Sequence, residues 1–475
     1  MYQVPQHVSK DKIFIVNKSD IDGRLDPKMA LYNQSVQHAL YPMVKLKSLL
    51  LSKPQYGANE ASITRDNNEQ PRYIRITDID ENGLISPDEL GATVANLDDK
   101  YILNENDIVI ARSGATVGKA YIHKNLPYTC VYAGYLIRFI VDSKKILPDY
   151  LFAYTQLNTY KEWVNAIQRP SAQPNINAEE YQSLEIPLPN LSKQQEIVGY
   201  INTAYAQKRA KEVEAQQLLD SIDDYLLKEL GITMPNINAE LTDRIFYVNY
   251  SDLSNRLDPY YSLKYFQKSF EAVHSGKYPV VSLKSLSTLI TSGITPKSGG
   301  DAYVDDRLNG IPFIRSGNIN IDGELDFNDL LYIRPDVHKT IMKSSQVRKN
   351  DLMIAIVGAT IGQVGIYVFD NEANINQAIA LVRLKDGINV EYVKELIKSS
   401  IGQLSLNRLK RPVARANINL EEIATIQVVL PPYEIQQKIA NQIQCIRRQA
   451  KALQAEGKAI LDNVKQKVEQ IIMGK

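Results

Sequence analysis

The sequence has few of the side chains that build metal and redox sites. Among its 475 residues there are only two cysteines, five histidines and one tryptophan. Cys130 and Cys445 lie in different halves of the chain at non-equivalent positions, so neither a disulfide framework nor a thiolate metal site is expected. The scattered histidines make a zinc site equally unexpected. The sequence therefore predicts no metal centre.

The sequence also lacks long apolar runs and a strong charge of either sign. No run approaches the roughly 18 apolar residues that a membrane-spanning helix needs, and residues 1–12 are polar, without the hydrophobic core of a signal peptide. A cytoplasmic protein with no membrane contact is expected. The net charge is only +1, so the basic balance typical of nucleic-acid-binding proteins is missing. Any phosphate-binding face must be local, and charged loops in solvent are the plain alternative.

What the sequence does contain is an internal repeat. Matched segments recur in the same order in both halves: residues 19–27 match 251–259, 41–49 match 278–286, 106–118 match 350–362, and 188–195 match 430–437. Colinear matches of this kind indicate duplication of a whole domain, with small differences in loop length. Two diverged copies of one domain suit a protein that presents similar surfaces to two different targets. The repeat therefore predicts bipartite recognition.

Each half ends in a segment with the apolar spacing of a long helix. Apolar residues recur at alternating intervals of four and three, which is the spacing of a coiled-coil seam. The expected seam residues are Ile197, Ile201, Leu218 and Ile222 in the first helix and Ile439, Ile443, Ile446, Leu453, Ile460 and Val464 in the second. Gly457 and Lys467 interrupt the second seam, and Gly231 and Gly474 stand where C-terminal caps belong. Because so narrow a stripe buries little against a globular domain, the helices are expected to pair with each other as an antiparallel coiled coil with pseudo-twofold symmetry.

The globular parts mix strand-like and helical segments. Strands are expected at residues 108–111, 135–140, 352–357 and 380–384, and helices at 150–167 and 390–408. The fold class expected is α+β, with two tandem homologous α/β domains, each followed by a long helix. The expected boundaries are 1–190 for the first domain, 191–231 for the central helix, 232–430 for the second domain and 431–475 for the C-terminal helix. Polar loops between the strands are the natural place for a recognition surface.

Two segments resemble catalytic motifs but lack essential residues. Residues 114–119, Gly-Ala-Thr-Val-Gly-Lys, resemble a phosphate-binding P-loop, but one residue is missing between the glycines and Ala120 stands where a Ser or Thr should bind magnesium. Residues 430–433, Leu-Pro-Pro-Tyr, resemble the Asp/Asn-Pro-Pro-Tyr motif of amino-methyltransferases, but Leu430 replaces its hydrogen-bonding residue. A glycine turn and a proline stop before a helix explain both segments. No catalytic residue is predicted.

Two variable domains, each closed by a proline-containing segment that leads through Gln-Gln into a long helix, resemble the DNA specificity subunit of type I restriction–modification systems. The segment runs from Pro187-Leu188-Pro189 through Gln194-Gln195 to Ile197, and again from Leu430-Pro431-Pro432 through Gln436-Gln437 to Ile439. Asn175-Ile176-Asn177, Asn417-Ile418-Asn419 and Gly293-Ile-Thr295-Pro296-Lys297-Ser298 also resemble family patterns. Residues 55–58, Gln-Tyr-Gly-Ala, depart from the last of these patterns. That departure implies a different base specificity in the first domain.

The resemblance implies a subunit with no catalytic activity and no cofactor of its own. In that family each domain reads one half of a split, asymmetric site in double-stranded DNA, and the paired helices act as a ruler that fixes the spacer. The resemblance also implies two methyltransferase partners, which methylate adenine, and two restriction and translocation partners. S-adenosylmethionine, ATP and Mg²⁺ are expected only in those partners. The segments Arg24–Pro27 and Arg256–Pro259 have no assigned role.

Candidate DNA contacts follow from side-chain chemistry. Arg and Lys can bind guanine edges, and Asn and Gln suit adenine, whereas contacts to phosphate only set the register. The candidates are Arg65, Arg72, Arg75 and Arg112 in the first domain and Thr295, Lys297, Arg315, Asn318 and Lys343 in the second. Taken singly, each is more often a plain surface residue. The neighbourhoods of Pro170 and Gln173 and of Pro412 and Arg415 could instead meet the methyltransferase.

Two other functions are compatible with the sequence. A stand-alone DNA-binding regulator would bind a duplex as a purified single chain and would more often show a helix-turn-helix or a strongly basic face. A non-catalytic protein scaffold is permitted by the near-neutral charge. Site-specific DNA binding that appears only with a methyltransferase would separate the specificity subunit from both.

Overall fold

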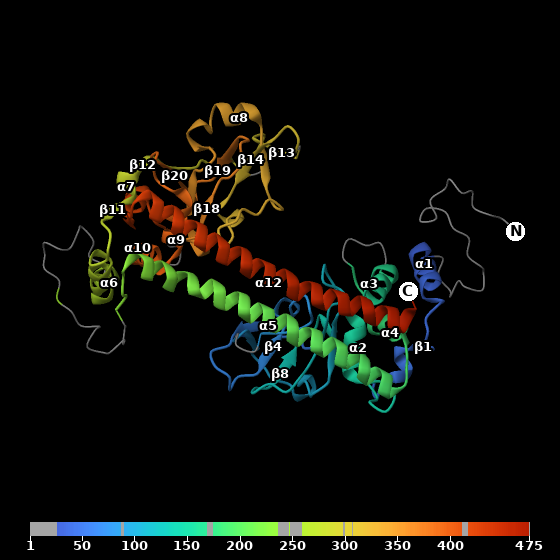
Figure 1. Cartoon of the computed structure of the whole chain (residues 1–475). Helices are drawn as coiled ribbons and strands as arrows, with labels where there is room; N and C mark the ends of the chain where they lie inside the picture. Colours follow the sequence, from blue (N-terminus) through green and yellow to red (C-terminus); the bar gives the residue numbers. More distant parts are fainter. Residues whose placement is uncertain are drawn as a thin grey trace. The chain divides into compact units, whose positions relative to one another are not determined.

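The computed structural model describes residues 26–86, 90–168, 174–235, 247, 259–297, 300–305, 307–410 and 417–474. They form two units, each with its own globular domain (Figure 1). Unit 1 comprises Met1–Glu212 with Gln454–Lys475, and unit 2 comprises Val213–Leu453. Both long helices are therefore divided between the units, a division that the expected boundaries did not include.

Unit 1 is built from short strands in small sheets, with helices packed on them. Its helices are α1 (Pro27–Val36), α2 (Pro148–Thr155), α3 (Asn158–Ile167) and α4 (Ala178–Gln182). Its strands are β1 (Met43–Lys45), β2 (Gln55–Tyr56), β3 (Ser62–Thr64), β4 (Arg72–Ile74), β5 (Ala92–Val94), β6 (Ile108–Ala111), β7 (Ala120–Ile122), β8 (Cys130–Tyr132), β9 (Leu136–Phe139) and β10 (Glu185–Pro187). The strand orders are β1-β10, β2-β9-β6-β7 and β3-β5-β4-β8.

Unit 2 repeats this plan. Its helices are α6 (Lys264–His274), α7 (Leu283–Leu286), α8 (Pro335–Lys339), α9 (Val390–Lys398), α10 (Ser400–Leu409) and α11 (Leu420–Ala424). Its strands are β11 (Val280–Ser282), β12 (Ser287–Ser292), β13 (Tyr303–Val304), β14 (Ile311–Ile314), β15 (Leu331–Ile333), β16 (Gln346–Val347), β17 (Leu352–Ala355), β18 (Val364–Ile366), β19 (Ala373–Ile375), β20 (Ile379–Leu384) and β21 (Gln427–Val429). The orders β11-β21, β12-β20-β17-β18 and β13-β15-β14-β19-β16 correspond to those of unit 1. The two tandem homologous α/β domains are therefore confirmed.

The central strand of each domain forms where an apolar run follows a fixed turn. Strands β6 and β17 are buried along their whole length. Each is preceded by an asparagine in the left-handed region, Asn106 with φ 72° and Asn350 with φ 69°, which asparagine tolerates better than most residues. The strands expected at residues 108–111, 135–140, 352–357 and 380–384 are confirmed as β6, β9, β17 and β20.

Each helix predicted within the globular parts is in fact two helices, so this prediction was wrong for residues 150–167 and 390–408. The second helix of each pair begins where a carboxylate from a long helix caps it. Glu469 Oε1 accepts from the Thr159 amide at 2.6 Å, and Asp223 Oδ1 accepts from the Ser400 amide at 2.8 Å. A carboxylate there satisfies an exposed amide and favours the helix dipole. Local periodicity cannot reveal a cap that comes from a distant part of the chain.

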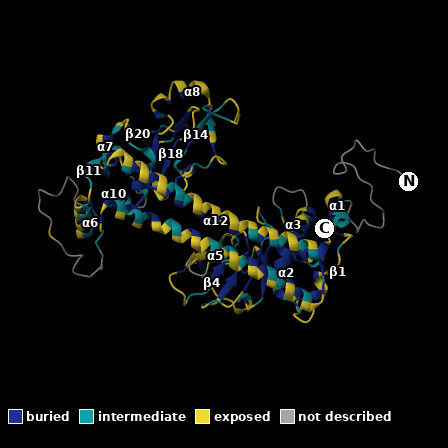
Figure 2. Cartoon of the chain, viewed as in Figure 1, coloured by how far each residue is buried: buried dark blue, intermediate teal, exposed yellow. Residues whose placement is uncertain are grey.

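The two long helices, α5 (Leu191–Leu230) and α12 (Tyr433–Met473), pack against each other (Figure 1). Unit 1 holds the N-terminal part of α5 with the C-terminal part of α12, and unit 2 holds the reverse, so the pairing is antiparallel, as expected. Ile201 joins Ile472 in the core of unit 1, and Ile222 joins Ile443 in the core of unit 2. Buried residues alternate with exposed ones along both helices (Figure 2).

The seam follows most of the expected residues and shifts near its end. The buried ones are Ile197, Ile201, Ile222, Ile439, Ile443 and Ile446, whereas Leu218, Leu453, Ile460 and Val464 are partly buried. In the last part of α12, the buried apolar side chains are Leu461, Val468, Ile472 and Met473. Gly457, which interrupts the apolar spacing, is buried against α5: a Cβ atom there would lie 3.3 Å from the Lys208 carbonyl oxygen. The missing side chain therefore lets the two helix backbones approach closely.

Candidate functional site

The glycine turns that follow β6 and β17 are structural. Positive φ angles of 76° to 93°, which favour glycine, occur at Gly114, Gly118, Gly358 and Gly362. Lys119, at the position of a P-loop lysine, donates its ammonium to the carbonyl of Ile79. These segments are therefore tight turns between strands, as the sequence indicated.

The repeated Asn-Ile-Asn motif holds the residue that follows each central strand. The amide of Ile176 donates to the carbonyl of Arg112 at 2.8 Å, and the amide of Ile418 donates to the carbonyl of Ile356 at 3.0 Å. The last asparagine of each motif caps the next helix, Asn177 for α4 and Asn419 for α11. The family-like motif thus has a structural role in both units.

A second backbone bond fixes the same positions from the other side. The amide of Arg112 donates to the carbonyl of Tyr135 at 2.9 Å, and the amide of Ile356 donates to the carbonyl of Ala378 at 2.9 Å. Beside these positions, the last residue of β2 pairs with β9 in unit 1, and the last residue of β12 pairs with β20 in unit 2. The two pairings have the same register relative to the central strands β6 and β17. Each unit therefore presents three equivalent positions on one backbone frame, here called the variable triplet. The triplet is Tyr56, Arg112 and Tyr135 in unit 1 and Ser292, Ile356 and Ala378 in unit 2.

Of the predicted DNA contacts, Arg112 is the one that belongs to the variable triplet. Its guanidinium lies over the Tyr56 ring, 4.8 Å from the centroid, and its Nε donates to Asn175 Oδ1 at 3.5 Å. Tyr135, beside it on the frame, is 65% exposed. The structure thus joins one predicted residue to two tyrosines that sequence reasoning missed. The only sequence signal for Tyr56 was the departure of residues 55–58 from the family pattern.

Arg65 and Arg72 lie inside the first domain. Both are at most 1% exposed. The Arg65 guanidinium lies 4.3 Å from the centroid of the Tyr128 ring, and Arg72 donates to the Tyr128 hydroxyl and to the carbonyl of Ser86. Neither guanidinium reaches the surface of the domain, where DNA could bind. Of the three arginines predicted to contact DNA in this part of the chain, Arg65 and Arg72 are therefore buried, and Arg75 is half-buried.

Arg75, Arg315 and Asn318 stabilise equivalent loops after β4 and β14. Arg75 binds the Asp78 carboxylate through Nε at 3.1 Å and Nη2 at 2.8 Å. Arg315 Nη2 lies 2.8 Å from the Asp329 carboxylate. Asn318 is 3% exposed, and its side chain accepts from the Arg315 amide at 2.9 Å. Binding of DNA by either arginine would compete with these internal partners.

Thr295, Lys297 and Lys343 lie on the surface of the second domain. The Thr295 hydroxyl donates to Gln377 Oε1. Neither lysine makes an ion pair with another residue in the described part of the chain. All three remain predicted DNA contacts.

Several predictions fall outside the described residues. These are Arg24, the segment 256–258, and Pro170, Gln173, Pro412 and Arg415. The first extension is described from Asp26 onwards. Asp26 Oδ1 accepts from the Lys28 amide at 3.0 Å and Pro27 opens α1, so this Asp-Pro pair is a helix start.

The repeated Gln-Gln pair marks a buried junction between each domain and its own long helix. Gln194 is 0% exposed; its side chain accepts from the Leu147 amide at 2.8 Å and donates to the carbonyl of a preceding proline at 2.9 Å. Gln436 makes the equivalent bonds, accepting from the Asn389 amide at 3.0 Å. These structural residues were visible in the sequence only as a repeated motif.

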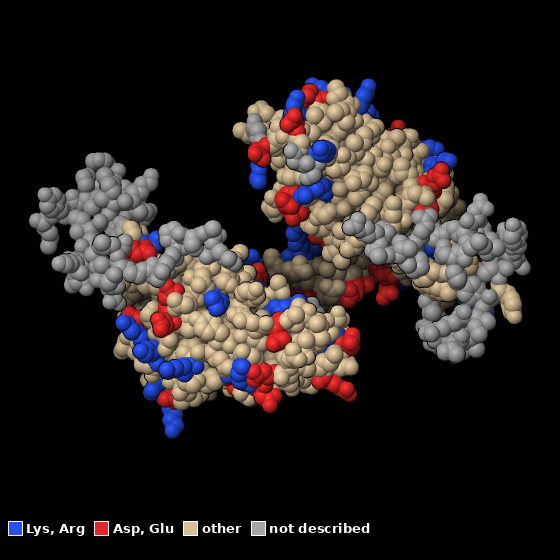
Figure 3. Space-filling model, turned by 180° about the vertical axis from the view of Figure 1, so that it is seen from behind, with Lys and Arg blue, Asp and Glu red and all other residues tan. Residues whose placement is uncertain are grey.

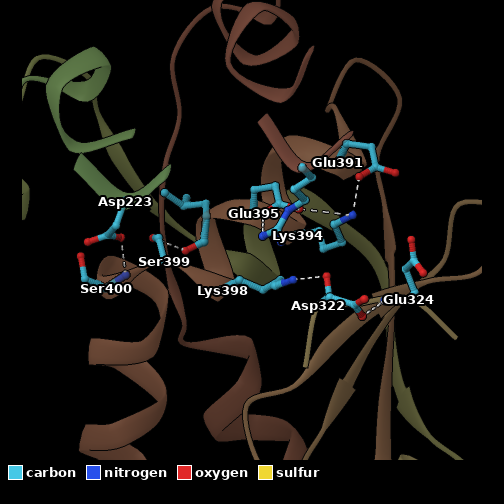
Figure 4. Close-up of polar contacts among 11 residues, drawn as sticks. Asp223, Asp322, Glu324, Glu391, Lys394, Glu395, Lys398, Ser399 and Ser400 are labelled. Atoms are coloured by element: carbon cyan, nitrogen blue, oxygen red, sulfur yellow. Dashed lines mark hydrogen bonds and ion pairs between the residues drawn. The ribbon is translucent and has the colours of Figure 1, made fainter. Parts of the chain in front are cut away.

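In unit 2 the domain is fastened to the long helices by polar contacts (Figure 4). Glu395 of α9 is 2% exposed and binds Arg447 of α12 through two hydrogen bonds of 2.6 and 3.2 Å. Nearby, Lys398 donates its ammonium to the carbonyl of Asp322, and burial lowers the pKa of Lys398 to about 8. These contacts hold α9 and the loop around Asp322 firmly within the unit.

Charge does not mark a binding face on the side of the molecule that Figure 3 shows. Basic and acidic side chains are interspersed on the face that Figure 3 shows, in keeping with the net charge of +1. Within the described ranges, no group of His, Cys, Asp and Glu could hold a metal ion, and no helix is long and apolar enough to cross a membrane. The variable triplet gives the two units different side chains on the same backbone frame: Arg112 is partly exposed, whereas Ile356 is 5% exposed and packs in the core of unit 2.

The protein contains a duplicated α/β domain and an antiparallel helix pair. The two domains share one backbone frame but carry different side chains on it, which defines a protein with two related recognition surfaces. The sequence matches the type I restriction modification DNA specificity domain over residues 45–219 and 262–459. The chain belongs to this family.

Individual relatives are more distant. The chain is 27% identical over 301 residues to the type I restriction enzyme EcoBI specificity subunit of Escherichia coli, a match that covers 62% of this chain but only 58% of that protein. It is 21% identical over 382 residues to the EcoKI specificity subunit of Escherichia coli strain K12, covering 78% of this chain and 74% of that protein. A solved structure described as the structural basis of complex assembly and conformational transition of the type I R-M system contains a similar chain. That chain is 16% identical, with a TM-score of 0.48, and the match covers 90% of this chain and 96% of that one.

Proposed function

We propose that this chain is the DNA-specificity subunit of a type I restriction–modification complex. Each domain reads one half of an asymmetric, bipartite site in double-stranded DNA. The proposal rests on the variable triplet: the same backbone bonds hold Arg112 and Ile356, while the side chains differ at all three positions. Two readers of different sequences need this combination of a shared frame and different side chains, because base identity is read by side-chain donors, acceptors and apolar groups.

In this proposal the paired helices set the distance between the half-sites. Helix α5 has 40 residues, and a helix of that length is about 60 Å long, more than one turn of B-DNA at about 34–36 Å. Ile446→Asp or Leu218→Asp would place a charge in the seam and should abolish discrimination between gap lengths. A retained gap preference in both variants would contradict the ruler.

The chemistry in this proposal belongs to partner subunits. Two methyltransferase subunits, which use S-adenosylmethionine, methylate adenine, and two restriction and translocation subunits use ATP and Mg²⁺. The chain itself supplies no catalytic residue. Support for such an assembly comes from the EcoBI and EcoKI relatives, which are specificity subunits of type I restriction enzymes.

Selection from random duplex DNA tests the proposal. The chain would be purified with a methyltransferase subunit from the same genome and bound to a random duplex pool, and the retained duplexes would be sequenced. The expected result is two short specified blocks separated by a gap of constant length, with no enrichment by the chain alone. Specific binding by the chain alone would favour a stand-alone regulator. A stable complex that enriches no sequence would favour a protein scaffold.

A further inference from the structure

The arginines in the described part of the first domain differ in what their guanidinium groups bind. Arg65 and Arg72 are buried, and Arg75 and Arg138 pair with aspartates. Arg112 has neither property. Within the described residues, its two terminal nitrogens have no hydrogen-bond partner and no carboxylate. The two terminal nitrogens of Arg112 are therefore available to a ligand.

The contacts that orient Arg112 do not use those nitrogens. Its guanidinium stacks on Tyr56, and the Tyr56 hydroxyl accepts from the Ala178 amide at 3.1 Å, which holds the ring. Its Nε donates to Asn175, and its backbone amide donates to Tyr135. A guanidinium held by its face and its Nε presents the remaining edge in one direction. Such preorganisation reduces the entropy lost on binding.

We propose that Arg112 reads a guanine in the half-site bound by the first domain, its two terminal nitrogens donating to O6 and N7 of the base in the major groove. This inference rests on the proposed function. The planar guanidinium matches the two adjacent acceptors of guanine, whereas adenine offers one acceptor and one donor, and cytosine offers a donor. A guanine therefore satisfies both free nitrogens where the other bases do not.

The second domain lacks this reader. Ile356 replaces Arg112, and Ser292 and Ala378 replace the two tyrosines on the same frame. An isoleucine has no donor for a base edge, so the second half-site cannot be read by this route. The comparison provides a matched control within one chain.

The test uses the complex of chain and methyltransferase with the random duplex selection, followed by competition binding with single-base changes. Wild type should select an invariant guanine in one block. Arg112→Ala should lower discrimination for that guanine roughly 5- to 150-fold, the range typical of a bidentate contact, while the other block stays unchanged and shows that the variant is folded. Arg112→Lys should restore discrimination only in part, because lysine lacks the planar fork. Ser292→Ala, at the partly buried position of unit 2 that matches Tyr56, should leave the guanine preference intact.

Other outcomes would overturn the inference. If wild type selects a bipartite motif that Arg112→Ala leaves unchanged, Arg112 reads no base, and the proposed function still stands. Equal weakening at every position would mark a phosphate contact instead. If wild type selects no bipartite motif, the proposed function and the inference both fail.

Discussion

The amide of Leu40 donates to the carbonyl of Ile472 at 3.2 Å. This bond joins the C-terminal end of α12 to the segment that leads into β1 of the first domain. The equivalent bond in unit 2 runs from the Lys277 amide to the Leu230 carbonyl at 2.9 Å. Leu40 and Lys277 each precede the repeated Tyr-Pro segment. The C-terminal end of α12 therefore contacts the first domain in the same way as the C-terminal end of α5 contacts the second domain. The expected caps at Gly231 and Gly474 are confirmed by their φ angles of 66° and 72°.

Loss of the C-terminal contact should destabilise the first domain. Ile472 is 0% exposed and belongs to the core of unit 1, and replacement of a buried isoleucine by alanine typically costs about 2–5 kcal/mol. Ile472→Ala should lower the free energy of unfolding of unit 1 by that amount, and Ile471→Ala, at a partly buried neighbour, by less. Hydrogen exchange followed by mass spectrometry would locate the loss. Faster exchange confined to unit 2 would contradict the docking.

The carboxylate cap on α10 should contribute measurably to stability. Asp223→Ala removes the acceptor of the Ser400 amide, and loss of such a cap typically costs about 1 kcal/mol. Asp223→Asn keeps an accepting oxygen and should cost less. Asp224→Ala, at an exposed neighbour, is the control. Urea denaturation of the four proteins checks this, and equal losses for Asp223→Ala and Asp224→Ala would count against the cap.

The buried pair of Glu395 and Arg447 should be strongly coupled. Arg447→Met leaves the Glu395 carboxylate buried with Lys394, 3.3 Å away, as its remaining ion-pair partner. Because that cation stays, the loss should be smaller than the roughly 3–5 kcal/mol typical of a buried charge left without a partner. Glu395→Gln in the same chain should recover part of this loss, because the unpaired charge is gone. A double-mutant cycle from denaturation midpoints measures the coupling. Strictly additive effects would show that the two side chains do not interact.

The pKa of Lys398 predicts a pH dependence of stability. Burial holds that pKa at about 8 in the folded chain, below the ordinary value of 10.5. Between pH 8 and pH 10.5 the Lys398 amine binds a proton more readily in the unfolded state than in the folded state. Lys398 therefore stabilises the folded state fully only above pH 10.5, and this stabilisation is lost as the pH falls to 8. Lys398→Met should remove this dependence, so wild type should gain relative to the variant as the pH rises. Urea denaturation of both proteins at several pH values across this interval measures the difference in their stability. A difference that does not change with pH would rule the effect out.

The repeat was sufficient to predict the architecture, because duplicated apolar patterns reflect burial within each domain. It could not separate Arg112 from Arg65 and Arg72, because the burial of an arginine is decided by tertiary neighbours. The helix breaks were hidden for the same reason. The carboxylates of Glu469 and Asp223 that cap the second helices lie 310 and 177 residues away in the sequence.

In the proposed function, two domains read different half-sites at a fixed distance. Genome-wide mapping of methylated adenines by single-molecule sequencing tests this most directly, in cells that express this chain together with its methyltransferase. The expected result is one split, asymmetric motif with a constant gap, absent when the methyltransferase is expressed alone. A continuous motif, or no new methylation despite a stable complex, would contradict bipartite recognition.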